Sequence, residues 1–388
     1  MKLTDICDFQ GGSQPPKEEW SFEVKEGYIR MLQIRDFTQS EKVTPEYVKI
    51  SNSTKICEAD DILIARYGAS IGKILTGLAG AYNVAIMRTI PDTNKIQKKY
   101  LYYYLKSSYF QKSILNVGSR AAQAGFNKED LSKIHIKCPN KEEQDNIINI
   151  LEKIELIIKK RKDELFYLDN LIKARFVELF GDPVSNPKKW NVKKLKDLSI
   201  QINSGNTPKG GAENYVEEGI VFFRSQNVWK DRLEMDDIAY IDAKTHASMK
   251  RSSLKHGDIL MTKTGRINTE NSSLGRAALY LGEDDMANVN GHVYFIRLKP
   301  EVNNKFILRI LVSPEYRDLI RSVCVGGIDK RQLNKEHIED FPIICPPSDI
   351  VEKYVAFVDQ VDKSKVAVQK ALDETKLLFD SLMQKYFG

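Results

Sequence analysis

The sequence has little cysteine and histidine, and neither is arranged as a metal site requires. The 388 residues include five cysteines and five histidines, with no Cys-x-x-Cys and no His-x-x-x-His pair. A structural zinc ion needs such closely spaced ligands, so no structural metal is expected. An odd number of cysteines without pair spacing is typical of reduced thiols, which predicts a cytoplasmic protein.

Long apolar runs are also missing. No uninterrupted apolar stretch approaches the roughly 20 residues that a membrane-spanning helix needs. The first residues, Met1 to Asp5, form no apolar signal core. We therefore expect no membrane partner.

The motifs of the main nucleotide chemistries are absent as well. The Pro-Pro pairs that begin at Pro15 and Pro346 do not fit the Asn/Asp-Pro-Pro-aromatic motif of a DNA methyltransferase. A nuclease of the Asp…Glu-x-Lys type is not supported, because no Glu lies between Asp92 and Glu129. Neither a Gly-x-x-x-x-Gly-Lys-Ser/Thr phosphate loop nor a Gly-x-Ser-x-Gly motif occurs. The sequence therefore favours a non-catalytic protein with no catalytic residues and no cofactor of its own.

What the sequence does contain is a long internal repeat. The segment from Asn127 to Gly181 returns from Asn334 to Gly388 at a constant offset, 334 − 127 = 207, without a gap. Each copy opens with Asn-Lys-Glu, passes through Cys-Pro and closes with Phe-Gly. Three landmarks in fixed register are not plausibly a coincidence.

After its proline, each copy has a heptad pattern, which predicts a long helix with one apolar seam. About forty residues at a rise of about 1.5 Å give a rod of roughly 60 Å. The two helices would most simply bury their seams against each other as an antiparallel coiled coil, with a pseudo-twofold relation between the halves; two ordinary amphipathic core helices are the alternative. The seam positions are Ile147, Leu151, Ile154, Ile158, Arg161, Leu165, Leu168, Ile172, Arg175 and Leu179, and then Tyr354, Val358, Val361, Lys365, Val368, Leu372, Thr375, Phe379, Leu382 and Tyr386.

The segments before the helices also match, more loosely. A Leu-x-Asp-Ile/Leu opening at Leu3 and at Leu195 precedes a Gly-rich turn in each half. Gly257 to Leu260 reads Gly-Asp-Ile-Leu, and the first half has Asp60 in place of the glycine. The second copy then carries about six extra residues before its Leu-Gly-Arg, an insertion typical of a surface loop.

These patterns predict a mixed α/β protein with four parts. They are a first globular domain at 1–140, a first helix at 141–181, a linker with a second globular domain at 182–345, and a second helix at 346–388.

Basic and amide side chains gather in the loops of both globular domains. The net charge of +6 is only a mild excess, so the loops as groups, and not the whole chain, suggest nucleic acid. Basic side chains suit phosphates and guanine edges, and amides suit adenine edges. For any one of them a solvated surface role is the more common one. The candidate DNA-contacting residues are Gly12, Ser13, Gln14, Arg66, Lys73, Arg120, Gln123, Asn206, Gln226, Asn227, Lys263, Arg266, Asn271, Arg276, Asn290 and Lys330.

In its repeated order of domain and rod, the whole chain resembles the DNA-specificity subunit of type I restriction-modification systems. The string Ala174 to Pro183, at the end of the first rod, is its most family-like stretch. One departure is that the first domain lacks the lead-in that Trp190 provides to the second.

The resemblance implies two target-recognition domains, each reading one half of a bipartite sequence in double-stranded DNA. It implies rods that set the gap between the half-sites and dock two methyltransferase subunits. Those subunits would hold S-adenosylmethionine, and restriction motor subunits would join them. A solitary DNA-binding or anti-restriction protein, a single-chain methyltransferase and a structural coiled-coil adaptor are the alternatives.

Overall fold

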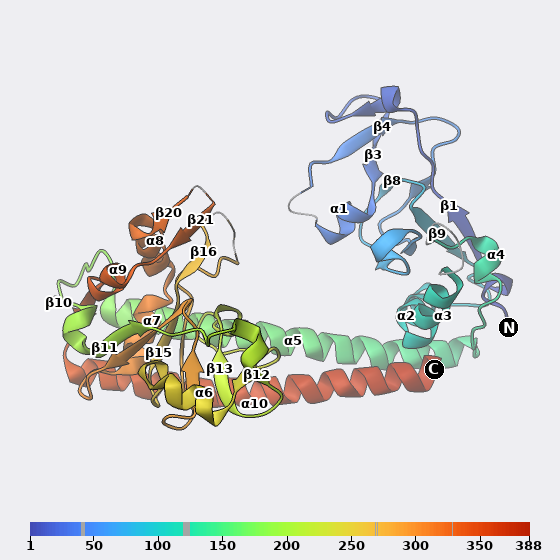
Figure 1. The fold of residues 1–388 in the computed structure, drawn as a ribbon. Coiled ribbons are helices and arrows are strands. Elements are labelled where there is room, and N and C mark those ends of the chain that lie inside the picture. Colours follow the sequence, from blue (N-terminus) through green and yellow to red (C-terminus); the bar gives the residue numbers. More distant parts are fainter. Residues whose placement is uncertain (40–42, 119–124, 268, 270, 328) are drawn as a thin grey trace. The chain divides into compact units, whose positions relative to one another are not determined.

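The computed structural model describes residues 1–39, 43–118, 125–267, 269, 271–327 and 329–388. Their contacts divide the chain into two units, each with its own sheets (Figure 1). Unit 1 comprises Met1–Leu165 and Ala367–Gly388, and unit 2 comprises Phe166–Val366. Each unit therefore contains one globular domain and part of both long helices.

The two long helices begin shortly after Pro139 and Pro347. Helix α5 is Lys141–Phe180 and helix α10 is Ser348–Phe387, each 40 residues long. Every residue that the heptad pattern assigns to the two seams is buried or half-buried. The predicted seams are therefore confirmed, and a period of 3.5 residues keeps them on one side of each helix.

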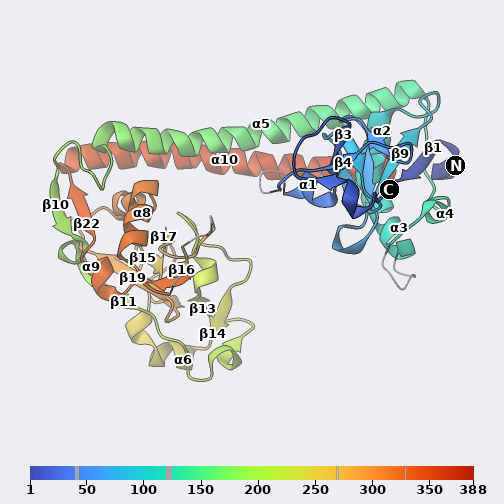
Figure 2. The same ribbon diagram turned by 90° about the horizontal axis from the view of Figure 1, so that it is seen from above.

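Within each unit the two helices lie side by side and run antiparallel (Figures 1 and 2). In unit 1, Ile147 near the start of α5 shares a core with Phe387 at the end of α10. In unit 2, the rings of Phe180 and Tyr354 are 5.4 Å apart, and Asp169 pairs with Lys365 at 2.6 Å. Residue numbers rise along α5 as they fall along α10, which confirms the antiparallel pairing.

Beside its share of the long helices, the described part of unit 1 contains two sheets and four short helices. Helix α2 (Lys98–Lys106) supplies buried tyrosines to the same core as α5, and α3 (Ser108–Gly118) supplies Phe110 and Ile114; α4 is Lys128–Leu131. One sheet has the order β1 (Cys7–Gly11), β9 (Ile86–Pro91), β6 (Leu63–Ala65), β7 (Ile74–Leu75). The other has the order β2 (Trp20–Ser21), β4 (Glu46–Lys49), β3 (Tyr28–Leu32), β8 (Gly80–Tyr82), β5 (Ile56–Cys57), with α1 (Ile34–Thr38) after β3.

Unit 2 repeats this plan. Its helices are α6 (Ala243–Ser248), α7 (Asn304–Leu311), α8 (Pro314–Val323) and α9 (Lys335–Glu339). One sheet has the order β11 (Ser199–Ser204), β19 (Val293–Leu298), β15 (Ile259–Thr262), β17 (Ala277–Leu279). A second has the order β12 (Tyr215–Val216), β14 (Ala239–Ile241), β13 (Ile220–Phe223), β18 (Ala287–Val289). Two further sheets are β10 (Asn191–Lys194) with β22 (Pro342–Cys345), and β16 (Thr264–Arg266), β21 (Lys330–Gln332), β20 (Val325–Gly326).

The repeat extends to single hydrogen bonds. The N–H of Arg66 donates to the carbonyl of Ala85 at 2.8 Å, and the N–H of Lys263 donates to that of His292 at 2.9 Å. The acceptors keep the offset of the long repeat, 292 − 85 = 207, and the donors keep the offset of the matched segments around β6 and β15, 263 − 66 = 197. The two units thus share one fold although their loops differ in sequence and length.

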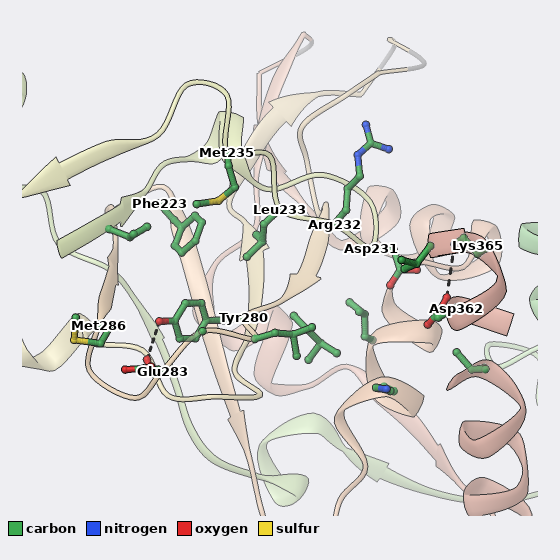
Figure 3. A pocket seen from close by; sticks show the side chains of 18 of the residues that line it. Phe223, Asp231, Arg232, Leu233, Met235, Tyr280, Glu283, Met286, Asp362 and Lys365 are labelled. Carbon is green, nitrogen blue, oxygen red and sulfur yellow. Dashed lines mark hydrogen bonds and ion pairs between the residues drawn. The ribbon is translucent and has the colours of Figure 1, made fainter. Parts of the chain in front are cut away.

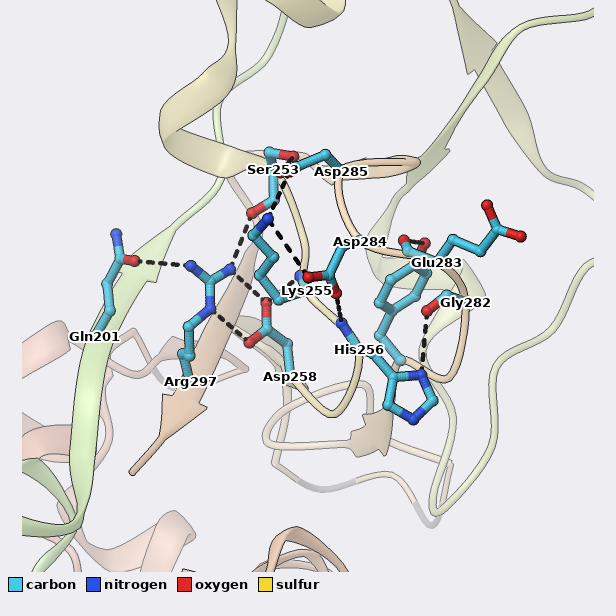
Figure 4. Close-up of polar contacts among 11 residues, drawn as sticks. Gln201, Ser253, Lys255, His256, Asp258, Gly282, Glu283, Asp284, Asp285 and Arg297 are labelled. Carbon is cyan, nitrogen blue, oxygen red and sulfur yellow. Dashed lines mark hydrogen bonds and ion pairs between the residues drawn. The ribbon is translucent and has the colours of Figure 1, made fainter. Parts of the chain in front are cut away.

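The aspartate of the Gly-Asp-Ile-Leu motif has a structural role. The carboxylate of Asp258 accepts from the guanidinium of Arg297 through both oxygens, at 2.9 and 2.8 Å (Figure 4). It also accepts from the N–H of Lys255 at 2.8 Å. In unit 1 the equivalent aspartate, Asp61, pairs with Arg88 at 2.8 Å, although Arg88 lies two residues before the position that corresponds to Arg297 (297 − 207 = 90). A buried carboxylate with several charge-assisted donors fixes the turn that starts β15 and β6.

Among the residues that the structure describes, no helix is both long enough and apolar enough to cross a membrane.

Candidate nucleic-acid interface

The candidate residues occupy three kinds of environment. Arg120 and Gln123 lie outside the described residues. Seven candidates are exposed: Gln14, Lys73, Asn206, Gln226, Arg266, Asn271 and Lys330. Five are half-buried, namely Gly12, Ser13, Arg66, Lys263 and Asn290, and two, Asn227 and Arg276, are buried.

In each unit, the backbone of the Gly-rich turn passes very close to another backbone segment of the same unit. A Cβ atom on Gly12 would lie 2.1 Å from the carbonyl oxygen of Asn83, and one on Gly205 would lie 1.9 Å from that of Val289. The N–H of Gly12 donates to Ile86 at 3.1 Å. Only glycine fits at such distances. Gly12 therefore serves the fold, while the Gln14 and Asn206 side chains that follow the two glycines are exposed.

Asn227 was predicted to contact DNA, and its environment contradicts this. Its side chain is only 1% exposed. The amide nitrogen donates to the carbonyls of Glu234 and Asp237 at 3.1 and 2.9 Å, and its oxygen accepts from the N–H of Arg224 at 2.9 Å. With its hydrogen bonds already made inside the domain, the amide stabilises a loop instead of reading a base.

Two predicted arginines are also used internally. Arg66 donates from Nε to the carbonyl of Phe126 at 3.2 Å and stacks on Tyr67, 5.0 Å from the ring centre. Arg276 is only 8% exposed and donates from Nε to the carbonyl of Ser272 at 2.9 Å. A direct contact of Arg276 with DNA is therefore contradicted by its burial, whereas Arg66 is half-buried.

Three other candidates come together on the sheet of β16, β21 and β20, which we call the basic ribbon (Figure 1). Arg266 lies opposite Lys330 in the antiparallel register, and Gly265 lies opposite Arg331. Lys263 immediately precedes β16, and its carbonyl accepts from the N–H of Leu333 at 2.9 Å. The sequence prediction missed Arg331, although the Lys-Arg pair was a usable signal.

The positive charge of the basic ribbon is only weakly neutralised within unit 2. Arg266 pairs with Asp329 at 3.3 Å, and both side chains are 66% exposed. An ion pair so exposed contributes little, about 0–1 kcal/mol. The major groove of DNA is wide enough for a two-stranded ribbon. The pair of strands β16 and β21 therefore offers exposed basic donors that suit contact with DNA.

The described part of unit 1 contains one residue pair that matches the basic ribbon. Tyr67 forms an isolated antiparallel bridge with Gly125, which corresponds to the pairing of Thr264 with Gln332 in the basic ribbon. Arg120 and Gln123 precede Gly125 in the sequence and lie outside the described part of the chain.

A pocket of about 880 Å³ in unit 2 has a different character (Figure 3). Its walls include Phe223, Leu233, Tyr280 and Leu308, with Asp362 and Lys365 of α10 at one side. A mostly apolar lining does not suit a phosphate backbone, so the basic ribbon is the better candidate interface. In the described part of the chain, no group of three or more His, Cys, Asp or Glu side chains is suited to a metal ion.

Comparison with known families agrees with the repeated fold. The model of the type I restriction modification DNA specificity domain matches residues 1–166 and again residues 187–375. The chain belongs to this family. The two matches place one specificity domain in each half of the sequence, as the internal repeat does.

The chain is also similar to curated relatives in sequence and to solved structures in fold. The type I restriction enzyme MjaIX specificity subunit of Methanocaldococcus jannaschii is 25% identical over 99% of this chain and 91% of its own. The MjaVIII specificity subunit of that organism is 23% identical over 84% of this chain and 77% of its own. The S subunit of a type I restriction-modification system from M. genitalium has a similar fold, with a TM-score of 0.54, 16% identity, and coverage of 100% of this chain and 95% of that one. A chain from a study of type I system assembly has a TM-score of 0.61 at 15% identity, covering 100% and 96%.

Proposed function

We propose that the protein is the DNA-specificity subunit of a type I restriction-modification system, a non-catalytic subunit that reads a bipartite DNA sequence. The observation that carries this proposal is that the specificity domain occurs twice, at residues 1–166 and 187–375. Two copies with the same frame and different loops are suited to two different half-sites. The comparisons give no support to a solitary binder.

Recognition would combine two kinds of contact. Lysine and arginine side chains on exposed loops neutralise phosphates, which supplies affinity without sequence information. Arginine and amide side chains reach base edges in the major groove, which supplies specificity. In unit 2 the basic ribbon offers both kinds, with Arg266 and Lys330 on adjacent strands.

The remaining expectations follow from this function. The protein would direct two methyltransferase subunits to the site, and restriction motor subunits would join the complex. S-adenosylmethionine would bind the methyltransferase subunits, so this chain would need no cofactor. The complex would work in the cytoplasm, where its DNA and its partners are present.

A map of methylated bases tests the proposal. When the chain is co-expressed with its methyltransferase subunit, we expect modified adenines within two short half-sites around a fixed gap. Replacing residues 1–140 by the corresponding domain of a relative should change one half-site and leave the other unchanged. A continuous motif, or no modification by an assembled complex, would contradict the proposal.

The basic ribbon gives a second test, in competition binding by the assembled complex at several salt concentrations. Arg266→Ala should lower discrimination at one position of one half-site by about 1–3 kcal/mol, because a bidentate contact with guanine is lost. Lys330→Ala should weaken binding to all sequences and reduce the salt slope by about one, as loss of a phosphate contact does. Lys353→Ala, at an exposed lysine in the second turn of α10, is the matched control. Ribbon variants that behave like this control would exclude the ribbon from the interface.

A further inference from the structure

One buried arginine in unit 2 joins two exposed loops. The guanidinium of Arg276 stacks on Trp229, with its central carbon 3.9 Å from the ring centre. The same guanidinium donates from Nε to the carbonyl of Ser272 at 2.9 Å and from Nη2 to the carbonyl of Asn271. Its face therefore contacts the segment 229–232, which we call the Trp229 loop, and its edge contacts the segment 271–273 of the inserted loop.

The charge of Arg276 makes this arrangement unusual. The hydrogen-bond acceptors described for its side chain are neutral carbonyls, and burial lowers its pKa, as do the neighbouring charges of Arg317 and Arg232. Burial of a charge costs free energy, which a neutral side chain would avoid. A planar guanidinium, however, can stack with its face and at the same time donate several hydrogen bonds from its edge.

The first half of the chain provides an internal comparison. Lys73 occupies the position that corresponds to Arg276, and it is exposed. The loop before Lys73 is about six residues shorter, because the offset is 263 − 66 = 197 before the loop and 276 − 73 = 203 after it. The buried arginine thus occurs in the copy that has the insertion.

Both joined loops present polar side chains to solvent. Lys230 and Arg232 are exposed on the Trp229 loop, and Asn271 is exposed on the other. The Trp229 loop is also fixed by Asp231, whose carboxylate pairs with Arg309 of α7 at 2.7 Å. The Asn271 segment is held on β15 and β16 by hydrogen bonds of Thr262 and Ser273. The Arg276 side chain contacts both this segment and Trp229.

We propose that the stack of Arg276 on Trp229 is a positioning device for specificity, which sets the two loops of unit 2 at the spacing that one DNA half-site requires. This inference rests on the proposed function and goes beyond it, because it assigns the specificity of one half-site to residues that do not touch DNA. Arg276 is a positioning residue, and the contacts are made by side chains of the loops that it joins.

The test uses the full chain in complex with its methyltransferase subunit and compares methylated sequences. Arg276→Lys keeps the positive charge but loses the planar face that stacks on Trp229 and the two N–H donors, on Nε and Nη2, that bond the carbonyls of residues 272 and 271. We expect it to reduce discrimination at one or more positions of the unit 2 half-site by about tenfold, the loss of one good base contact. The unit 1 half-site and the gap should stay unchanged. Trp229→Leu should have the same effect, and Trp229→Phe, which keeps an aromatic face, should largely restore discrimination.

The control is Lys353→Ala, the exposed lysine of α10 that lies outside the candidate contacts, which should leave the pattern of base discrimination unchanged in both half-sites. If Arg276→Lys and Trp229→Leu reduced methylation of all sequences equally, the inference would be overturned. Partial unfolding of unit 2 has this effect, whereas a change in loop spacing alters discrimination between bases. An unchanged motif for both variants would overturn it too. If the wild-type complex produced no bipartite motif, the proposed function itself would fail, so the two failures are distinguishable.

Discussion

Removing one heptad from each long helix should shorten the gap between the half-sites by about three base pairs and leave both half-sites unchanged. Seven residues at about 1.5 Å each remove roughly 10 Å of helix, and B-DNA rises about 3.4 Å per base pair. Suitable segments are residues 162–168 of α5 and 366–372 of α10. They lie between the contact of Arg161 with Thr375 and the ion pair of Asp169 with Lys365. Methylation mapping measures the gap directly.

The matched control removes the heptad from α5 alone. This change displaces Arg161 from Thr375 and shifts one seam against the other, so we expect loss of methylation without a new gap. A paired deletion that left the gap unchanged, or that altered a half-site, would show that the helices do not determine the spacing. A polar residue at a single seam position is a known determinant of helix register, which makes this comparison sensitive.

The second large effect is expected from Gly205→Ala, which should destabilise unit 2 by about 3 kcal/mol or more. The new Cβ would lie 1.9 Å from the carbonyl oxygen of Val289 and 2.5 Å from that of Asn290, and backbone atoms cannot move aside as a flexible side chain can. Gly12→Ala should act in the same way on unit 1, where the obstacle is the carbonyl of Asn83. Hydrogen exchange assigns the loss of protection to one unit or the other.

Gly291→Ala is the control for this pair of variants. Gly291 follows Asn290 in the same turn, but the nearest atom to its added Cβ would be 3.7 Å away, an ordinary contact. We expect the free energy of unfolding of this variant to lie within about 0.5 kcal/mol of the wild-type value. If Gly205→Ala were as stable as Gly291→Ala, the close approach of the two backbones would not be a feature of the folded domain.

The sequence was informative where local pattern sets the structure. Positions such as Leu151 and Leu372 were placed on the seams by heptad spacing alone, and both are buried in long helices. The Gly-Asp-Ile-Leu motif is also local: Gly257 has a positive φ in the turn, and strand β15 begins two residues later at Ile259. Periodicity and turn chemistry act over a few residues, so they can be read without knowledge of what packs nearby.

The sequence was less informative about the loops. Asn227 and Arg276 were chosen for their donors and acceptors, yet those atoms are bonded inside unit 2. Arg276 contacts Trp229, 47 residues earlier in the chain (276 − 229 = 47), and no local pattern announces that contact. Lys330 was chosen by the same reasoning and is exposed opposite Arg266. Side-chain chemistry thus identified the loops, but it did not identify which side chains of each loop are exposed to solvent.

By itself, the sequence determined the internal repeat, the two long helices, the alternation of domain and helix, and the lack of the motifs of the main nucleotide chemistries. These are properties of order, period and composition, and each is present in the chain before it folds. Only the tertiary structure decided which loop side chains are free to meet DNA. It also assigned Gly12 and Gly205 to backbone packing, paired Arg266 with Lys330, and buried Arg276 against Trp229. The physical reason is that exposure depends on contacts between distant segments, which form only when the strands and loops of a unit come together.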